Sequence, residues 1–365
     1  MSLSPLTPDH GPATPPPAPQ SVEWSDPHRR EAFETWLASV DAGRGLDAAA
    51  VEPASADASF RRYLRVPLRS SPGTSLIIMD APPPLEDVRP FVTLARRMEE
   101  QGLPGPRVLA AQEELGFLLL DDLGRQPLLG VLQAEPEQAD ARMRQVGELL
   151  VQWQMALQGQ PLPAFDEAML RRELELFPDW CVAREHRMDW SPAQRQTWER
   201  VCRVLIDSAL AQPVVTVHRD WMPRNFMVQG QRLSILDFQD AVIGPVTYDA
   251  ASMLRDAFIS WDEERQIDWA VRYWERARRA GVPVQDDFGE FWRALEWMGL
   301  QRHLKVLGIF CRLKHRDGKP RYAQDLPRFF AYATHVALRY RELAPLMSLI
   351  EPLSGFRSEE GFTLR

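Results

Sequence analysis

One polar segment near the middle of the chain constrains its fold more than any other. It reads His218-Arg219-Asp220-Trp221-Met222-Pro223-Arg224-Asn225 and continues through an apolar stretch to Leu236-Asp237-Phe238. In phosphoryl transfer from ATP, an aspartate accepts the proton of the attacking hydroxyl, and an asparagine and a second aspartate hold Mg²⁺ against the phosphates. Asp220, Asn225 and Asp237 have the spacing that this chemistry requires. With strands expected over 214–217 and 233–236, the segment predicts a catalytic loop and hairpin rather than a loop with ordinary surface carboxylates.

The composition of the chain narrows the class of protein. Its 365 residues, 45% hydrophobic and 26% charged, are typical of a soluble globular protein with one large domain or two lobes. A net charge of -8 argues against nucleic-acid binding, which requires a basic face. Three scattered cysteines fit a reducing compartment and lack the pairing of a zinc site. Since no apolar run is long enough to span a membrane and no signal peptide is evident, we expect a cytoplasmic protein without a membrane partner.

Hydrophobic periodicity divides the chain into a small lobe rich in strands and a larger helical lobe. The expected order is a disordered proline-rich extension over 1–22, an N-lobe over 23–120, a hinge over 121–125, and a C-lobe with the catalytic loop and substrate site over 126–365. This arrangement predicts an α+β fold in a two-lobed kinase plan. The expected N-lobe elements are helices over 27–40 and 86–101 and strands over 59–66, 75–79, 108–111 and 117–120. The expected C-lobe helices cover 138–158, 166–186, 192–211, 247–258, 263–280, 287–313 and 323–345.

The segment that follows the second aspartate carries a resemblance to a known family. It reads Leu236-Asp237-Phe238-Gln239-Asp240-Ala241-Val242-Ile243-Gly244-Pro245-Val246-Thr247-Tyr248-Asp249-Ala250-Ala251. The chain resembles the aminoglycoside phosphotransferase-like small-molecule kinases, a branch of the protein-kinase-like superfamily. In that family an aspartate is likewise followed by a short segment, a glycine and a proline, and a second aspartate that opens a helix. The resemblance implies a protein-kinase-like fold, with ATP and Mg²⁺ as cofactors. The gap between Asp237 and Asp249 is too short for the activation loop of a kinase that acts on proteins.

Further stretches are similar to the cytoplasmic anomeric sugar kinases of this family, which act on N-acetylmuramate and N-acetylglucosamine. The similarity runs from about residue 27 to 345. It implies phosphorylation of the C1 hydroxyl to a sugar 1-phosphate, in a peptidoglycan (cell-wall) recycling route towards UDP-sugars. The implied partner is a small amino sugar, and we expect a monomer. The stretches that carry the similarity are Ser55–Tyr63, Met79–Pro83, Leu119–Gly124 and Arg302–Phe310.

Each polar residue of the central segment has an expected role. Asp220 is the expected catalytic base, which orients the acceptor hydroxyl in line with the γ-phosphate. Asn225 and Asp237 are the expected Mg²⁺ ligands because they offer hard oxygen donors. His218 is expected to brace the loop rather than to act as an acid or base. Asp249 is expected to accept hydrogen bonds from the loop backbone at the start of a helix.

The expected N-lobe lacks the lysine that binds the ATP phosphates in the usual kinase pattern. Met79 occupies the strand position of the phosphate-binding lysine, and Pro90 and Phe91 lie near the position of its glutamate partner. We expect Arg61 or Arg62 to replace the missing charge. Because side chains alternate along a strand, only one of the two arginines can point to the nucleotide, and a solvent-facing position is the alternative.

The remaining nucleotide contacts are expected from the main chain. The loop ending at Ser59 is poor in glycine, but its small side chains let backbone N–H groups approach phosphate. By resemblance to the family, Asp121 and Leu123 would contact adenine through their main chains.

A basic segment over 302–321 points to the charge of the substrate. It contains seven Lys or Arg and one acidic residue, and Lys305 and Arg312 share a helix face with Arg302 close by. Such a cluster suits an anionic substrate such as the lactyl carboxylate of N-acetylmuramate, whereas a solvated helix end is the alternative. Trp221 either stacks on the sugar ring or packs under the loop.

Two rival functions remain open at the level of sequence. One is a related kinase for an aminoglycoside, choline-like or homoserine-like substrate, against which the basic segment argues. The other is a nucleotide-binding pseudokinase module, suggested by Met79 in place of lysine. The intact Asp220, Asn225 and Asp237 argue against a pseudokinase.

Overall fold

The computed structural model divides the chain into two compact units. It describes residues 22–56 and 60–354, so Ser59 and nearly all of the expected N-terminal extension lie outside the described residues. Of the described residues, the first unit holds those up to Val92 together with Arg107–Asp122, and the second holds Thr93–Pro106 and those from Leu123 to residue 354.

This division differs from the expected continuous N-lobe. Residues 93–106 pack with the second unit, so the first unit is built from two separate stretches of chain. The return into the second unit, between Asp122 and Leu123, falls inside the segment expected as a hinge. The interruption was not predicted, because periodicity shows which residues are buried in a helix but not which neighbour covers them.

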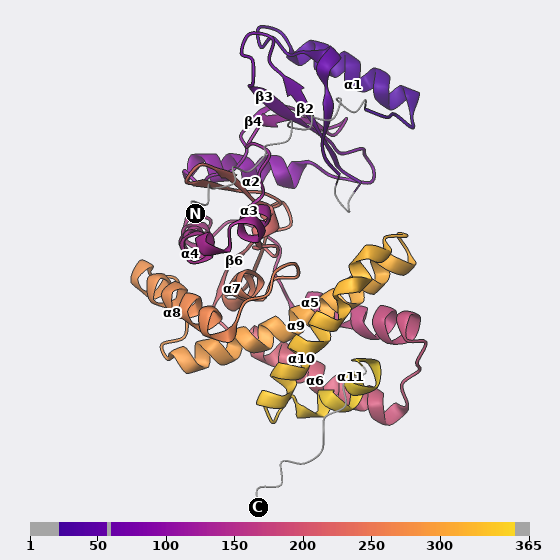
Figure 1. The fold of residues 1–365 in the computed structure, drawn as a ribbon, viewed down its shortest axis with the longest axis vertical. Helices are drawn as coiled ribbons and strands as arrows, with labels where there is room; N and C mark the ends of the chain where they lie inside the picture. The colour runs from indigo at the N-terminus through magenta and orange to yellow at the C-terminus, as the bar shows by residue number, and fades with distance from the viewer. Residues whose placement is uncertain (1–21, 57–59, 355–365) are drawn as a thin grey trace, which may run out of the picture. The chain divides into compact units, whose positions relative to one another are not determined.

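Antiparallel strands form the sheet of the first unit (Figure 1). Among the described residues the sheet has five strands in the order β1-β2-β3-β5-β4, and each pairs with its neighbour in antiparallel fashion. The first strand was not predicted, and its last two residues, Ser55 and Ala56, were assigned to the phosphate loop. The strands are β1 (Glu52–Ala56), β2 (Arg62–Pro67), β3 (Ser75–Asp80), β4 (Val108–Gln112) and β5 (Phe117–Asp121).

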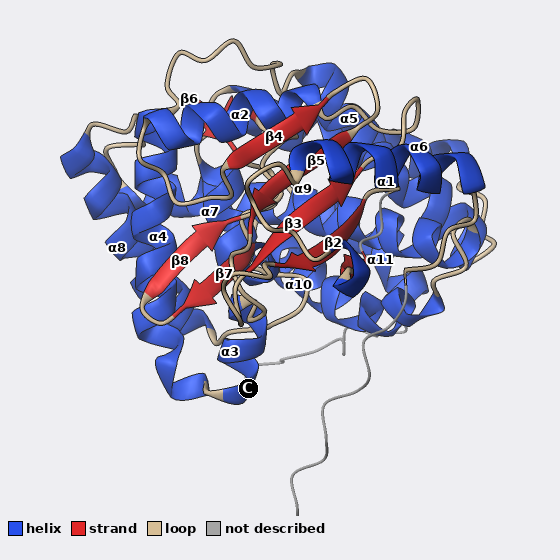
Figure 2. Ribbon diagram, turned by 90° about the horizontal axis from the view of Figure 1, so that it is seen from above, coloured by secondary structure: helices blue, strands red, loops and turns tan. Residues whose placement is uncertain are grey.

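Helix α1 (Pro27–Val40) covers one face of this sheet (Figure 2). Asp26 caps its N-terminus, and Pro27 occupies the first position, where a missing N–H leaves no acceptor unsatisfied. Alternate residues of β2 turn to this helix, as the period of a strand requires. The buried cluster consists of Phe33, Trp36 and Leu37 of the helix, Leu46 of the following loop, and Leu64, Val66, Ile78, Phe117 and Leu119 of the sheet.

The second unit is mainly helical, as predicted. Helix α2 (Arg89–Glu100) begins in the first unit and continues into the second. Expected helix ends differ from the observed ones by a few residues, and α3 and α11 were not predicted. Across the described residues, no helix is long and apolar enough to cross a membrane. The other helices are α3 (Leu128–Ala134), α4 (Ala139–Ala156), α5 (Glu167–Leu176), α6 (Pro192–Leu210), α7 (Thr247–Leu254), α8 (Glu263–Ala280), α9 (Phe288–His315), α10 (Leu326–Arg339) and α11 (Met347–Ser354).

Two small antiparallel pairs of strands carry the central polar segment. Strand β6 (Val214–Val217) pairs with β9 (Val242–Pro245), and β7 (Phe226–Gln229) pairs with β8 (Arg232–Ile235). The two strands expected from sequence therefore belong to different pairs. The segment over 218–225 leaves the first pair and enters the second, so both of its ends are fixed by strand hydrogen bonds.

Helices α5 and α9 pack closely beside this segment. The chain of α5 continues into a π-helical stretch, η3 (Phe177–Glu185), which also packs on α9. At Gly308 a Cβ atom would come within 2.3 Å of the backbone of Leu176, so only glycine permits this approach. The contact brings residues of α5 within reach of the polar face of α9.

Candidate active site

The expected catalytic loop, residues 218–225, is held in an unusual backbone conformation together with Asp237. Arg219 has φ of 80° and Asp237 has φ of 61°, both in the left-handed region that side chains with a Cβ rarely adopt. Such conformations persist only where surrounding contacts impose them, and they gather at functional sites. Arg219 directly precedes Asp220, the expected base, and Asp237 is itself an expected Mg²⁺ ligand. Both strained residues therefore belong to the candidate site.

His218 has the contacts expected of a brace. Its Nδ1 accepts from the Asp220 N–H at 3.3 Å, and its Nε2 lies 3.0 Å from the Leu236 carbonyl oxygen, to which it donates as the neutral tautomer. Burial lowers the pKa of His218 to about 4, so the ring is neutral at pH 7 and cannot serve as a charged acid. The ring therefore links the catalytic loop to the end of β8.

Asp249 fixes the backbone of the same loop from α7. Its two carboxylate oxygens accept from the N–H groups of His218, at 2.6 Å, and Arg219, at 3.0 Å. Burial raises the pKa of Asp249 to about 7, although these two bonds and the charge of Arg302 oppose the rise. These are the bonds expected of a residue that positions the loop.

Asn225 and Asp237 fit a divalent cation such as Mg²⁺. The Asn225 side-chain nitrogen donates to the Asp220 carbonyl oxygen at 2.9 Å, which leaves the side-chain oxygen as the group that can bind a metal. The Leu236 N–H donates to the Asn225 carbonyl oxygen at 2.9 Å and so ties the two ligand positions together. An amide oxygen and a carboxylate are hard donors of the kind that Mg²⁺ prefers.

A buried carboxylate on α5, Glu173, joins the loop to α9. It accepts from Arg219 at 2.7 Å, from the Lys305 ammonium at 2.8 Å and from Gln301 at 3.1 Å. Burial alone would raise the pKa of Glu173, but the charges of Lys305 and Arg219 outweigh it and lower the pKa to about 2. Glu173 is therefore an anion between two cations, and we call this set of contacts the Glu173 cluster.

The basic residues expected to bind substrate are not equivalent. Lys305 is paired with Glu173 and also donates to the Tyr248 hydroxyl at 3.1 Å. Arg302 donates to the Arg219 carbonyl oxygen at 2.8 Å and lies over the Tyr248 ring. Arg312 is half-buried, and its Nε is buried without an acceptor among the described residues. Lys305 and Arg302 are thus engaged within the chain, whereas Arg312 keeps a buried N–H without an acceptor among the described residues.

The structure contradicts the role of Trp221 as a sugar-stacking residue. Its side chain is 0% exposed, and its ring N–H donates to the Val146 carbonyl oxygen at 3.3 Å. The ring packs edge-on against His218 and Phe226, so neither face is open to a sugar. Trp221 therefore has the alternative role, packing under the loop.

The structure also contradicts a nucleotide role for Arg62. Its guanidinium binds Asp80 at 2.6 Å, and the same carboxylate binds Arg29 of α1. Alternation along β2 places Arg62 in phase with Leu64 and Val66, the residues covered by α1. It is therefore committed to the structural face of the sheet.

The other residues expected at the nucleotide are Arg61 and Asp121 of the first unit, which both have partners within the chain, and Leu123 of the second unit. Arg61 approaches Glu86 at 3.4 Å, and its role stays a prediction. Asp121 donates its N–H to the Arg107 carbonyl oxygen, and its carboxylate binds the Arg107 guanidinium at 2.6 Å. Leu123, at the start of the second unit, is half-buried.

Sequence reasoning missed two charged residues. Arg65 lies opposite Ile77, on the sheet face that also carries Met79, and is bound by Asp122 at 2.6 Å. Its phase along the strand becomes visible only once the register is known. Glu173 had a usable signal, because it occupies a position of the apolar stripe of its helix, where a carboxylate is costly unless paired.

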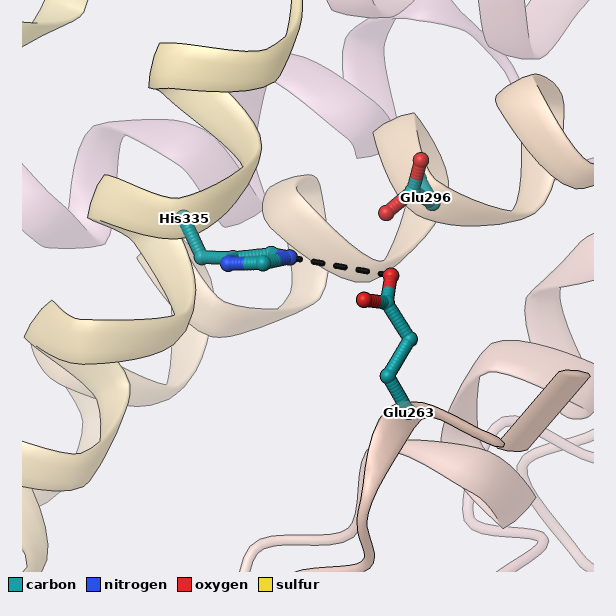
Figure 3. Close-up of side chains that lie close together, drawn as sticks. All are labelled: Glu263, Glu296 and His335. Atoms are coloured by element: carbon teal, nitrogen blue, oxygen red, sulfur yellow. Dashed lines mark ion pairs between the residues drawn. The ribbon is translucent and has the colours of Figure 1, made fainter. Parts of the chain in front are cut away.

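A second acidic group is formed by side chains of three helices (Figure 3). Glu263, Glu296 and His335, from α8, α9 and α10, come within metal-binding distance of one another. Arg339 binds both glutamates, and Arg255 binds Glu296 at 2.7 Å. Because two guanidiniums already neutralise the carboxylates, the group is an ion-pair network rather than a metal site; we call it the Glu296 cluster.

The loop, its braces and the two-unit fold define a class of protein. Residues 50–288 match the model of the phosphotransferase enzyme family, and the chain belongs to that family. The resemblance seen in the sequence is thereby confirmed, as is the α+β kinase-like fold. The enzyme is a phosphotransferase.

Relatives of known name narrow the identification. The chain is 47% identical over 334 residues to an N-acetylmuramate/N-acetylglucosamine kinase of Pseudomonas putida, covering 92% of this chain and 96% of the relative. It is 48% identical to the protein of that name in Pseudomonas aeruginosa, with 90% and 98% covered. The Neisseria meningitidis protein of the same name is 44% identical, with 92% and 99% covered.

Solved structures of distant sequence share the fold. A choline/ethanolamine kinase family protein from Mesorhizobium loti matches with a TM-score of 0.58 at 13% identity, covering 89% of this chain and 99% of that one. The ADP-bound aminoglycoside phosphotransferase APH(2'')-Ib matches with a TM-score of 0.55 at 12% identity, covering 85% and 99%. At this identity the likeness establishes the fold alone.

Proposed function

We propose that this protein is an ATP- and Mg²⁺-dependent kinase that phosphorylates the C1 hydroxyl of N-acetylmuramate and N-acetylglucosamine. The observation that carries the proposal is the braced loop over 218–225, in which the Asn225 side chain donates to the Asp220 carbonyl oxygen and the Leu236 N–H, next to Asp237, donates to the Asn225 carbonyl oxygen. The sugar is taken from the name that the three relatives share. The product is a sugar 1-phosphate, which fits a cytoplasmic, monomeric enzyme of peptidoglycan recycling.

The chemistry assigned to the chain is in-line transfer of the γ-phosphoryl group. Asp220 accepts the proton of the C1 hydroxyl while that oxygen bonds to phosphorus and ADP leaves. Mg²⁺, held by Asn225 and Asp237, would neutralise the charge of the ATP phosphates. His218 and Asp249 keep the carboxylate of Asp220 in place through the backbone bonds already described.

Arg312 is the residue that we assign to the substrate carboxylate. Lys305 and Arg302 are engaged within the Glu173 cluster and with the loop, whereas Arg312 keeps a buried N–H without an acceptor in the described part of the chain. In α9 the half-buried positions Lys305, Ile309 and Arg312 follow one another along one face. A guanidinium at the far end of this face suits a carboxylate, which it can bind through two parallel hydrogen bonds.

The rival functions are less well supported. A cationic aminoglycoside or choline-like substrate would meet a face of α9 that carries Arg302, Lys305 and Arg312. A pseudokinase has no need for the Asp220, Asn225 and Asp237 set.

The test is ³¹P NMR of the protein with Mg-ATP and each sugar, beside Asp220→Ala and Arg312→Gln. We expect an acid-labile sugar 1-phosphate with the wild type and a rate at least ~10³-fold lower in Asp220→Ala. Arg312→Gln should raise the KM for N-acetylmuramate about tenfold and leave that for N-acetylglucosamine within about twofold, because only the first sugar has a carboxylate. No sugar phosphate from the wild type would refute the function. An equal rise of both KM values would refute the role of Arg312 alone.

A further inference from the structure

The expected catalytic base follows Arg219, a residue held at its backbone N–H, its backbone carbonyl oxygen and its guanidinium. The Arg219 N–H donates to Asp249, its carbonyl oxygen accepts from Arg302, and its guanidinium binds Glu173. Its φ of 80° lies where a residue with a Cβ is disfavoured. A strained residue fixed at three points determines where the next residue in the chain points, and that residue is Asp220.

We propose that Glu173 is a positioning residue that holds the catalytic loop in its reactive conformation. Two of the three contacts involve the backbone N–H and carbonyl oxygen of Arg219, and they do not fix the orientation of its side chain. The contact with Glu173 is to the side chain, and it draws the guanidinium towards α5 and away from the loop. It therefore fixes the one part of Arg219 that the backbone bonds leave to rotate.

Glu173 also keeps two cations from competing for the catalytic base. Arg219 and Lys305 both donate to Glu173 Oε1, and both lie within electrostatic reach of Asp220. Glu173 and Asp220 are the two carboxylates whose charges act on both cations. If Glu173 lost its charge, Asp220 would be the remaining partner for Arg219 and Lys305. An ion pair with either cation would turn the base away from the acceptor hydroxyl.

The placement of Glu173 fits this role better than a purely structural one. It is 6% exposed, and its oxygens receive hydrogen bonds from three separate parts of the second unit: the loop, α9 and, at 3.5 Å, Tyr248 of α7. A buried carboxylate is costly to desolvate, and replacing such ion clusters with apolar residues often stabilises a protein. A positioning function gives a reason for the charge that stability does not.

The chain offers a matched control in Glu296. This carboxylate is 0% exposed and binds two arginines, Arg255 and Arg339, and within the described part of the chain its hydrogen bonds and ion pairs do not reach residues 218–225. Glu173→Gln and Glu296→Gln therefore make the same change at two buried glutamates. Only the first is expected to reach the catalytic loop.

The experiment compares kcat, both KM values and amide hydrogen exchange in Glu173→Gln, Glu296→Gln and wild type. We expect Glu173→Gln to lower kcat about 10 to 100-fold, with the KM for ATP within about twofold, because a misplaced base acts on the transferring step. Amide exchange in peptides covering 217–226 should accelerate. Glu296→Gln should lower the melting temperature while it leaves kcat within about twofold and exchange in the same peptides unchanged.

A double variant tests whether Glu173 acts through Arg219. Glu173→Gln combined with Arg219→Ala should lower kcat no further than the stronger of the two single variants. The reason is that each single variant already removes the ion pair between Glu173 and Arg219. Full additivity, unchanged kcat and exchange in Glu173→Gln, or an equal loss of kcat in Glu296→Gln would each overturn the proposal. The activity measurements rest on the proposed function. Exchange does not depend on the sugar, so a wild type that fails to phosphorylate either sugar still leaves the role of Glu173 decided by the exchange data.

Discussion

The Glu173 and Glu296 clusters use the same chemistry for different ends. Each is a buried glutamate bound by two cationic side chains and approached by a tyrosine hydroxyl, from Tyr248 in one case and Tyr340 in the other. In the Glu296 cluster the partners come from α10 and from the end of α7, so it joins helices. In the Glu173 cluster one partner is a strained loop residue beside the base. The role of a buried ion pair is thus set by what its partners are attached to.

The energetics of the two clusters should be alike even though their functions differ. Burying ions is costly, and the mutual attraction offsets the cost only while every partner is present. Removal of one partner leaves an uncompensated charge in either cluster. Stability alone therefore does not separate them, whereas turnover does.

The largest expected effect is on stability, in the Glu296 cluster. Arg255→Ala should lower the free energy of unfolding by about 3 to 5 kcal/mol, because Arg255 is 7% exposed and its loss leaves Glu296 short of a partner. The kcat of the folded protein should remain within about twofold. Urea unfolding and steady-state kinetics measure the two effects.

An exposed pair provides the control for that change. Arg276 binds Glu148 at 2.5 Å, with the arginine side chain 50% exposed, and Arg276→Ala should cost less than about 1 kcal/mol. If Arg255→Ala were equally mild, the Glu296 cluster would not be a stabilising network. If Arg255→Ala removed turnover as well as stability, the contrast between the clusters would fail.

The next effect is a pH dependence of stability that belongs to Glu173. Its pKa is lowered in the folded state from 4.5 to about 2, so its contribution is fully present above pH 4.5 and is lost as the pH falls towards 2. A shift of this size corresponds to about 3 kcal/mol. The difference in unfolding free energy between wild type and Glu173→Gln should therefore shrink steadily below pH 4.5. A difference that stays constant from pH 6 to pH 3 would show that Glu173 is not a stabilised anion.

The contrast between the clusters also shows what a sequence reveals. Asp220, Asn225 and Asp237 were predictable because a local spacing encodes them, and the braces His218 and Asp249 lie in the same two segments. The helical lobe was predictable because long periodic segments encode helices.

The features that the sequence did not predict depend on contacts between residues that are far apart in the sequence. Glu173 and Lys305 are 132 residues apart, and no local pattern pairs them. Arg61 and Arg62 both stayed candidates for the nucleotide because the phase of the strand relative to the sheet is unknown until β2 is paired with β3. Trp221 had two equally good roles, and only the packing of Trp153 and Phe226 around it distinguishes them.

The smallest expected effect tests whether His335 matters to the Glu296 cluster. Its Nε2 lies 3.7 Å from Glu263, and its side chain is 53% exposed, so water screens the interaction (Figure 3). His335→Ala should change the free energy of unfolding by less than about 0.5 kcal/mol and leave kcat unaltered. Added Zn²⁺ should shift the melting temperature equally in both proteins. A Zn²⁺-dependent stabilisation confined to the wild type would mean that the three side chains bind metal despite their arginines, and the cluster would then differ from that of Glu173 in chemistry as well as in place.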